Sequence, residues 1–437
     1  MKRTPFLAAL PILLLASAGT LADGAPATPT IEQLWDIIQA QQAEIDALKQ
    51  KQAATAATAT AADEKAEAAV VAVEESTTHT ASAGSWAEHT TIGGYGEMHY
   101  NNIDADDSSR DQKEIDFHRF VLFFGHEFTD DLRFFSELEI EHALTKDNVC
   151  DFTVPPGGLA PGDEICDGAS NPGEVEVEQA YIEFDINDQL STKGGIFILP
   201  VGIMNETHEP NTFYGVERND VENIIIPATW WAGGAAISGH HANGLSWDLA
   251  IHEGLKIPTT GGSAFRVRSG RQKTSEAVAD KLAYTGRVRY TGIPGLEVGA
   301  SVNYQTDPSQ SGGDGLDNGI LYETHVAYQN GPFALRALYA EWDFDGTAVN
   351  VAKADDQSGW YVEPSFKPRD DVGFYARYED IDAARSRDKF DQWEIGVNFW
   401  PHEDVVLKAD YRSRDHDLAV ESGRDFDAFD LGIGYQF

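Results

Sequence analysis

Charged side chains recur at every second position in several stretches, and their types and spacing could act on a small molecule. Glu137, Glu139 and Glu141 alternate with apolar residues, and Arg287 and Arg289 follow the same spacing. Successive side chains of a β-strand point to opposite faces, so this spacing places charges in rows on one face. Fixed rows of charge create a field that orders water and acts on ions and polar solutes.

The rows differ in sign along the chain, which predicts two facing walls of opposite charge. The acidic wall is expected to comprise Glu137, Glu139, Glu141, Glu183 and Asp185. The basic wall is expected to comprise Arg287, Arg289, Arg336, Arg377, Lys408, Arg412 and Arg414. Opposed walls would set a transverse field across a water-filled interior, and that field is compatible with partial neutralisation of the charges by one another.

The segment 200–231 is rich in carboxylates. Its charged residues are Glu206, Glu209, Glu217, Asp220 and Glu222, against Arg218 alone. If this segment narrows an interior passage, it would form an acidic constriction that favours cations. Most other long polar segments are also acidic; they would either concentrate cations at a channel mouth or simply form a solvated acidic surface.

One long segment is basic instead. The sequence FRVRSGRQK, Phe265 to Lys273, brings Arg266, Arg268, Arg271 and Lys273 together. These side chains could capture anions, or they could contact acidic loops of a neighbouring subunit, which we favour.

Little in the sequence predicts catalysis or metal binding. No G-x-S-x-G motif occurs, and the 13 histidines are scattered, with His240 and His241 beside a predicted turn. Cys150 and Cys166 are expected to form a disulfide that stiffens one long segment, since secretion permits oxidation. This pair alone offers too few ligands for a metal site. We therefore expect no enzyme activity, no metal and no cofactor.

Composition excludes several classes of protein. The chain has 437 residues and a formal net charge of −40, which excludes binding to a nucleic-acid backbone. Beyond the N-terminus, no apolar run is long enough for a transmembrane helix. A membrane-spanning β-barrel stays possible, because alternating strands leave only a weak hydropathy signal.

From Thr91 to Phe437 the apolar residues follow a period of two. Val372, Phe374, Ala376 and Tyr378 fall on one strand face, and Arg377 falls on the other. Seven short turns rich in Gly, Pro, Asn and Asp alternate with eight longer polar segments. Fifteen connections imply sixteen strands, and this alternation of connection lengths is typical of outer-membrane barrels. The fold class predicted is therefore all-β: a 16-stranded antiparallel transmembrane barrel occupying residues 91–437.

The chain before the barrel divides into three parts. Residues 1–22 are typical of a secretory signal peptide, with Lys2 and Arg3 ahead of a short apolar stretch. Residues 23–51 contain a three–four apolar spacing that predicts a short periplasmic coiled-coil helix, or alternatively a single amphipathic helix lying on the barrel base. Residues 52–90 are rich in Ala, Thr and Glu and are expected to form a flexible linker.

Two sequence blocks resemble known porins. The order GG, PVGI and FYGVER between Lys193 and Trp231 resembles the third-loop region of the phosphate-selective porin O and P family. The N-terminal coiled coil resembles that of the DcaP-like porins. Both resemblances imply a trimeric channel whose third loop folds inward to narrow the pore. The family's basic constriction is absent from 200–231, so phosphate selectivity does not follow from the resemblance.

These observations predict a porin in the bacterial outer membrane, with its N-terminal segment in the periplasm. It would let small hydrophilic solutes and ions diffuse passively, with a lean toward cations. A phosphate or anion channel and a mainly structural envelope tether are the alternatives. The partners expected are outer-membrane lipid and lipopolysaccharide, two further copies in a homotrimer, and the barrel assembly machinery through the terminal Phe437.

Overall fold

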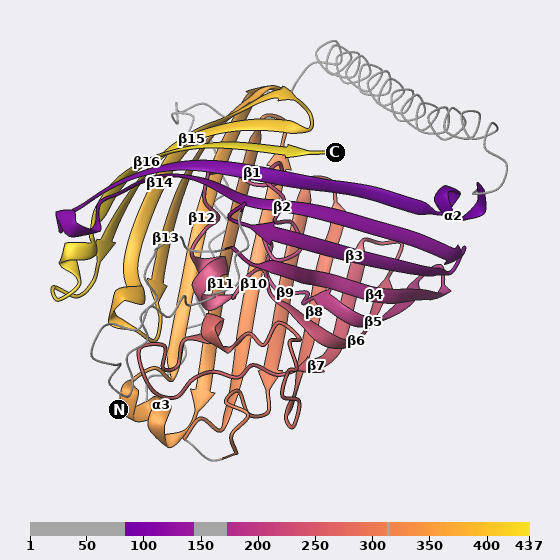
Figure 1. Ribbon diagram of the computed structural model, residues 1–437, viewed down its shortest axis with the longest axis horizontal. Coiled ribbons are helices and arrows are strands. Elements are labelled where there is room, and N and C mark those ends of the chain that lie inside the picture. Colours follow the sequence, from indigo (N-terminus) through magenta and orange to yellow (C-terminus); the bar gives the residue numbers. More distant parts are fainter. Residues whose placement is uncertain (1–83, 144–172, 313–314) are drawn as a thin grey trace, which may run out of the picture. The chain divides into compact units, whose positions relative to one another are not determined.

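The computed structural model describes residues 84–143, 173–312 and 315–437, and sixteen strands dominate this part of the chain (Figure 1). The signal peptide, the coiled-coil segment, most of the linker and the pair Cys150 and Cys166 lie outside the described residues. The strands are β1 Thr90–Ala105, β2 Gln112–Thr129, β3 Leu132–Glu141, β4 Val175–Asn187, β5 Leu190–Ile198, β6 Trp231–His240, β7 Leu245–Glu253, β8 Leu282–Ile293, β9 Leu296–Gln305, β10 Asn318–Asn330, β11 Phe333–Asp345, β12 Asp356–Arg369, β13 Val372–Asp382, β14 Lys389–His402, β15 Val405–His416 and β16 Phe426–Gln436.

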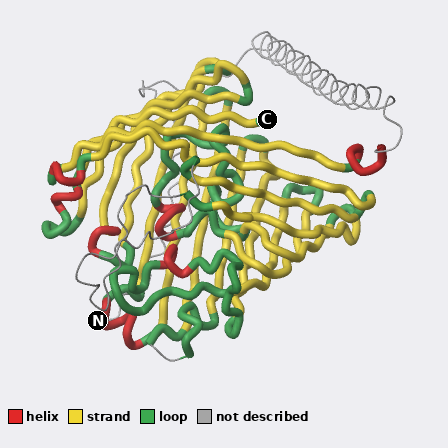
Figure 2. Tube along the Cα trace, in the orientation of Figure 1, coloured by secondary structure: helices red, strands yellow, loops and turns green. Residues whose placement is uncertain are grey.

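Helical elements are short and lie in the connections. They are α2 Gly84–Glu88, α3 Thr347–Ala352, η1 Ser108–Arg110, η2 Val221–Ile225, η3 Val267–Gly270, η4 Ser386–Asp388 and η5 Ser422–Arg424. Figure 2 shows how little of the described chain is helical beside the strands. Within the described residues, no helix combines the length and apolarity needed to cross a membrane.

The strands form one closed antiparallel barrel, which confirms the predicted fold class and strand number. Each strand pairs with its sequence neighbours, and β1 pairs with β16 to complete the ring (Figure 1). The terminal residue is part of this seam, because Gly94 and Phe437 exchange two backbone hydrogen bonds of 2.9 Å. Closure leaves no unpaired strand edge, as a membrane-spanning sheet requires.

The predicted alternation of faces is also found. Phe374 and Tyr378 are 48% and 39% exposed on the outer face of β13, whereas Arg377 between them is 3% exposed inside. The same pattern on β15 places Leu407 outside and Lys408 inside. A period of two therefore separates an apolar exterior from a charged interior.

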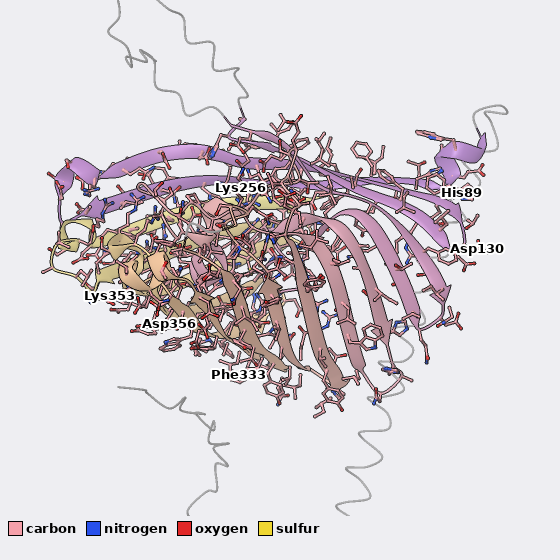
Figure 3. The ribbon with its side chains drawn as sticks, turned by 90° about the horizontal axis from the view of Figure 1, so that it is seen from below. His89, Asp130, Lys256, Phe333, Lys353 and Asp356 are labelled. Atoms are coloured by element: carbon pink, nitrogen blue, oxygen red, sulfur yellow. The ribbon has the colours of Figure 1, made fainter. Side chains whose placement is uncertain are left out.

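Connections alternate between short turns and longer loops along the described chain. Figure 3 shows Asp130, in the short turn between β2 and β3, near His89 ahead of β1 at one end of the barrel, and Lys353 and Asp356, beside a long loop, at the other. The strands extend further than their apolar residues indicate: β1 and β2 still pair at Ile103 with Gln112, close to the polar connection between them. Backbone pairing can continue past the last apolar side chain, because its hydrogen bonds do not involve side chains.

Two long connections fold into the barrel and form an apolar core there. We call residues 199–230, between β5 and β6, loop 3, and residues 254–281, between β7 and β8, loop 4. Their buried apolar side chains join those of β5–β7 and β10–β14 in one cluster, which includes Ile225, Trp230, Leu255, Phe265, Leu338 and Trp342. The indole of Trp342 also donates a 2.9 Å hydrogen bond to the carbonyl of Ile225. This apolar packing holds loop 3 in place.

Candidate functional site

Loop 3 reaches walls on different sides of the barrel interior. Glu206 forms an ion pair with Arg287 of β8, and Asp220 forms one with Arg414 of β15. Glu217 lies 3.1 Å from the imidazole of His99 on β1. The inward course expected for this loop is thus seen, and its charged residues connect it to strands far apart in sequence.

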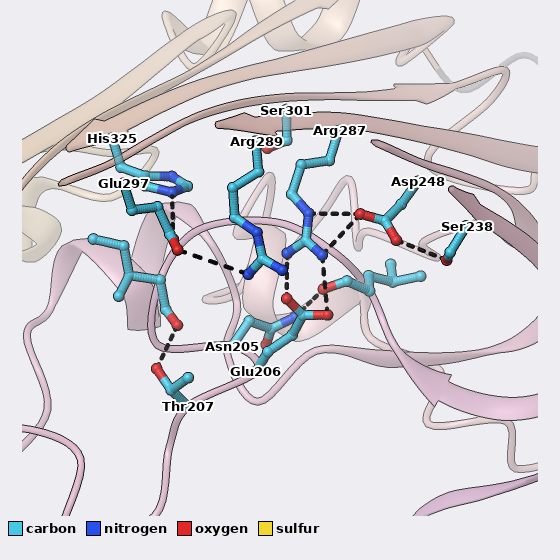
Figure 4. A network of polar contacts seen from close by, with 12 residues as sticks. Asn205, Glu206, Thr207, Ser238, Asp248, Arg287, Arg289, Glu297, Ser301 and His325 are labelled. Atoms are coloured by element: carbon cyan, nitrogen blue, oxygen red, sulfur yellow. Dashed lines mark hydrogen bonds and ion pairs between the residues drawn. The ribbon is translucent and has the colours of Figure 1, made fainter. Parts of the chain in front are cut away.

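The Glu206 contact belongs to a larger polar network (Figure 4). Arg287 donates to Asp248 at 2.9 Å while it also contacts Glu206, so its charge is shared between two carboxylates. Arg289, two residues along β8, lies 3.9 Å from Glu297, which in turn lies 3.4 Å from His325. Arg287 and Arg289 thus both face the interior, and both have acidic neighbours.

Glu222 occupies a different environment from the other carboxylates of loop 3. Its side chain is buried and accepts hydrogen bonds from the N–H groups of Ile203 and Met204, at 2.6 and 2.7 Å. The Asn219 amide and the Tyr361 hydroxyl donate two more, at 3.1 and 3.0 Å. Burial raises the pKa of Glu222, although these donors favour its charged form. The geometry assigns Glu222 to holding the loop together rather than to contact with a passing solute.

Glu209 stands apart from its neighbours in loop 3. It is half-buried, and no cationic side chain pairs with its carboxylate within the described residues. The nearby Arg336 of β11 donates instead to the carbonyl of Thr212, at 2.8 Å. Glu209 therefore keeps a free negative charge on this part of the loop.

The other basic side chains of the predicted wall also face the interior, where they hold loop 3 or pair with strand carboxylates. Arg377 contacts Glu363 at 3.2 Å and Glu394 at 2.5 Å. Arg412 lies 2.7 Å from Asp430, and the ammonium of Lys408 lies 3.6 Å from the ring centre of Phe213 in loop 3. Much of the predicted transverse charge is therefore locally balanced.

The residues of the predicted acidic wall lie in a row on β3, and those on β4 lie apart from that row. Glu137 and Glu139 are almost fully buried, and Glu141 continues their row. Glu183 and Asp185 lie nearer the short turn, where both pair with Arg133 at 2.9 and 2.6 Å. The β3–β4 register shifts between Glu137 and Leu138, and this irregularity brings other β4 carboxylates beside the β3 row.

His208 of loop 3 docks onto this acidic wall. Its Nε2 lies 3.4 Å from Glu137 and 3.6 Å from Glu178, and all three side chains are buried. Burial opposes the protonated imidazole, but the two carboxylates outweigh this effect and raise the pKa of His208 to about 10. A cationic His208 therefore attaches loop 3 to β3 and β4.

A polar pocket of about 380 Å³ lies on the side of the interior lined by β1, β2 and β15. Its wall includes Glu97, which pairs with Arg119 at 2.7 Å, and Glu217, which pairs with His99. The apolar cluster draws instead on β5–β7 and β10–β14. The apolar cluster and the polar pocket thus lie against different parts of the barrel wall.

Two arginines in the pocket have no carboxylate partner within the described residues. Arg218 donates to the Thr229 hydroxyl at 3.0 Å and to the His208 carbonyl at 3.2 Å. Arg268 of loop 4 donates to the carbonyls of Ala228 and Asn223. Burial lowers the pKa of each of these arginines, and so do other guanidinium groups nearby. Both arginines leave positive charge in the pocket.

The basic segment of loop 4 turns inward. Besides Arg268, Arg271 donates to the carbonyl of Thr229, and Lys273 donates to Glu174 at 2.8 Å. Three of the four basic side chains of this segment are thus used within the chain, and the expected contact with a neighbouring subunit stays a prediction. Arg268 and Arg271 turn inward because carbonyls in the irregular backbone of loop 3 need donors once buried.

Several interior residues were not singled out from the sequence. They are Glu97, His99, Arg119 and Glu178. A period-two polar pattern is present in EMHYN, from Glu97 to Asn101, and in VEVE, from Val175 to Glu178, and it could have identified Glu97, His99 and Glu178. The glycine-rich start of β1 and the irregular register of β4 weaken that pattern.

Comparisons with known proteins agree with this architecture. Residues 230–437 match a family model described as Gram-negative porin. A protein from Aquifex aeolicus (strain VF5), described as uncharacterized, is 32% identical over 387 residues, covering 79% of this chain and 80% of the relative. Similar solved structures include the outer membrane channel DcaP of Acinetobacter baumannii, with 12% identity, a TM-score of 0.52 and coverage of 80% of this chain and 97% of that one. The anion-selective porin from Comamonas acidovorans has 13% identity, a TM-score of 0.52 and coverage of 80% and 99%. At these identities the structural likeness shows the fold alone.

Proposed function

We propose that this chain is a Gram-negative porin that forms an outer-membrane channel and lets small hydrophilic solutes and ions diffuse passively through the polar part of its barrel interior. The arrangement of the interior carries this proposal. Loop 3 is packed into an apolar core, and a polar pocket of about 380 Å³ lies against a different part of the barrel wall. Charged walls interact favourably with hydrated polar solutes, whereas an apolar molecule makes no favourable interaction with them.

The charge of the whole chain best supports a channel that prefers cations to anions. The formal net charge is −40, and most long loops are acidic. Low-dielectric walls focus such a field and raise the local concentration of cations. Glu206, Glu217 and Asp220 each have a cationic partner, so we assign most of this preference to the channel mouth rather than to the predicted constriction.

An anion channel is the second candidate, and one observation favours it. Arg218 and Arg268 line the pocket without carboxylate partners. Guanidinium groups of this kind bind phosphate and carboxylate oxygens well. The resemblance to phosphate-selective porins points the same way.

The reversal potential of the full-length protein in a planar bilayer under a KCl gradient distinguishes the two candidates. A potential on the cation side is expected, and phosphate added at equal ionic strength should leave the current unchanged. A potential on the anion side together with phosphate block would establish the second candidate. If protein that migrates as a folded barrel in electrophoresis gives no conductance, both the cation-channel and the anion-channel candidate are contradicted.

Assembly and envelope contacts complete the proposal. We expect a homotrimer embedded in lipid and lipopolysaccharide, delivered through Phe437 to the barrel assembly machinery, with the N-terminal segment in the periplasm. Chemical crosslinking of the protein in its native membrane tests the trimer, since a ladder ending at three copies is expected and one ending at two would contradict it. No catalytic role is proposed.

A further inference from the structure

Two histidines and an aspartate converge on the wall of the polar pocket. Asp116 and His118 lie two residues apart on β2, so their side chains share one strand face. His142 follows β3 directly. The Nδ1 atom of His118 lies 3.2 Å from Asp116, and that of His142 lies 2.9 Å from each oxygen of the same carboxylate. All three residues line the pocket.

Neighbouring groups hold these imidazoles in place. The ring of His118 stacks on that of His99, with centroids 4.7 Å apart and planes 12° apart. His99 is itself fixed by Glu217 at 3.1 Å and Glu97 at 3.4 Å. The backbone N–H of His142 donates to the carbonyl of His118 at 3.2 Å. Asp116, His118 and His142 therefore come from β2 and from the residue after β3, and contacts with their neighbours restrict their freedom.

We propose that Asp116, His118 and His142 form a binding site for a divalent transition metal ion of the Zn²⁺ class. A site with two imidazole nitrogens and a carboxylate is better suited to Zn²⁺, Ni²⁺ or Cu²⁺ than to Mg²⁺ or Ca²⁺, which bind mostly oxygen ligands. Ligand atoms of a tetrahedral zinc site, bonded at about 2.0–2.1 Å, stand roughly 3.3 Å apart. The 2.9 and 3.2 Å separations seen between nitrogen and oxygen come close to this spacing. The pocket leaves a fourth position to water.

Other groups of potential ligands fit a metal less well. His402, Glu403 and Asp404 are consecutive in a turn, and the side chain of His402 is 64% exposed. Glu137, Glu178 and His208 are buried, and a protonated His208 already balances the two carboxylates there. Among the described residues, the Asp116 group alone combines two imidazoles, an open approach and supporting contacts.

A metal ion here would change the charge of the passage. It would add two positive charges beside Glu114 and Glu217, on the pocket wall. Zn²⁺ is therefore expected to lower the cation current. This consequence rests on the proposed channel function, whereas binding of the metal does not.

Equilibrium binding of Zn²⁺ to the refolded full-length protein in detergent tests the site. Isothermal titration calorimetry should detect one saturable site whose affinity for Zn²⁺ falls strongly in both His118→Ala and His142→Ala. His402→Ala removes the rival exposed group, and His126→Ala changes a β2 histidine at the opposite end of the strand; both should bind Zn²⁺ as the wild type does. Heat-modifiable electrophoretic mobility shows that each variant is folded.

Two results would overturn the proposal. Unchanged Zn²⁺ binding in folded His118→Ala and His142→Ala would mean that the three residues form only hydrogen-bonded ion pairs, and loss of binding in His402→Ala would place the ion on the exposed turn. Electron paramagnetic resonance with Cu²⁺ adds a direct readout, because two coordinated nitrogens are expected in the wild type and one in each pocket variant. Zn²⁺ block of current is then compared in the same variants: binding without block would count against the channel function and leave the metal site standing.

Discussion

Arg218 and Arg268 bring positive charge into a pocket where most carboxylates already have partners. Glu97, Glu217 and Asp220 each pair with a cationic side chain of a strand. An ion that passes this point therefore meets a local field different in sign from that of the acidic loops. At the scale of single residues, selectivity depends on how far each field reaches through water and salt.

Replacing Arg218 by Gln should increase the preference for cations. A unit charge about 8 Å away contributes roughly 0.5 kcal/mol in a water-like medium, with opposite sign for cations and anions. The ratio of cation to anion permeability should rise about two- to fivefold, measured as reversal potential under a KCl gradient. Arg369→Gln, which removes an exposed guanidinium paired with Asp371, serves as the control and should leave the ratio unchanged. An equal change in both variants would show that position in the pocket does not matter.

His208 should make the stability of the barrel depend on pH. The pKa of His208 is raised to about 10 by Glu137 and Glu178 against the opposing effect of burial. The stabilisation is fully present below the ordinary pKa of about 6.5 and is lost as the pH rises through about 10. The difference in unfolding temperature between wild type and His208→Gln should therefore shrink from pH 6 to pH 10.5. A difference that stays constant across this range would contradict the ion pair.

At the scale of elements, loop 3 is held by apolar packing as well as by ion pairs. Val221 and Ile225 of η2 are fully buried, and η2 contacts β11, β12 and β13. A loop fixed in this way is expected to narrow the passage as a rigid partition. Movement of the loop would expose this apolar surface to water in the lumen.

Val221→Ala should loosen that partition. Removing two buried carbons costs roughly 1–3 kcal/mol of packing and transfer free energy. Single-channel recordings should show more frequent current fluctuations than the wild type, with a similar mean conductance. Val351→Ala in α3 makes the same change at a side chain that is 86% exposed, and its recordings should match the wild type. Equal current fluctuations in the wild type, Val221→Ala and Val351→Ala would argue against the anchoring of loop 3 by apolar packing.

Like charges face each other across the strands β13, β14 and β15. Asp391 is directly opposite Asp380 on one side and Asp415 on the other. Such pairs destabilise a sheet. Asp391→Asn should therefore raise the free energy of unfolding by about 0.2–1 kcal/mol, measured by urea titration in detergent micelles. The gain should fall at high salt, and Asp188→Asn in a short turn should give none. A destabilised Asp391→Asn protein would imply an attractive role for that carboxylate.

At the scale of the whole molecule, the barrel closes without any segment before β1. Pairing of β1 with β16 uses residues from Tyr95 to Ala105 and from Phe426 to Gln436. The channel proposed here should therefore not require the predicted coiled coil. A mainly structural tether, the remaining alternative, would place the essential role in that segment instead.

Deleting residues 23–83 while keeping the signal peptide separates these roles. The shortened protein should retain the single-channel conductance of the wild type, because all sixteen strands and loop 3 remain. Cells that express it should show altered outer-membrane attachment only if the segment is a tether, measured by release of membrane vesicles. Loss of conductance in a folded, membrane-inserted variant would contradict the independence of the barrel.

The sequence by itself determined the number of strands, their phases and the ends at which long loops lie. Period-two alternation fixes which face of a strand is apolar, and Gly, Pro, Asn and Asp mark the turns, so these features are encoded locally. Arg377 inside β13 and Phe374 outside it follow from position alone. The inward course of loop 3 was implied by resemblance and not by local pattern.

Only the tertiary structure decided which charges remain free. Glu222 and Arg218 lie four residues apart in an acidic segment, yet one is enclosed by hydrogen bonds and the other faces the pocket. Asp116, His118 and His142 meet because β2 and β3 pair, although a short turn and most of two strands separate them in the chain. Pairing between charges depends on distances of a few ångströms between distant segments, and those distances are set by barrel closure and by packing of the loops inside it.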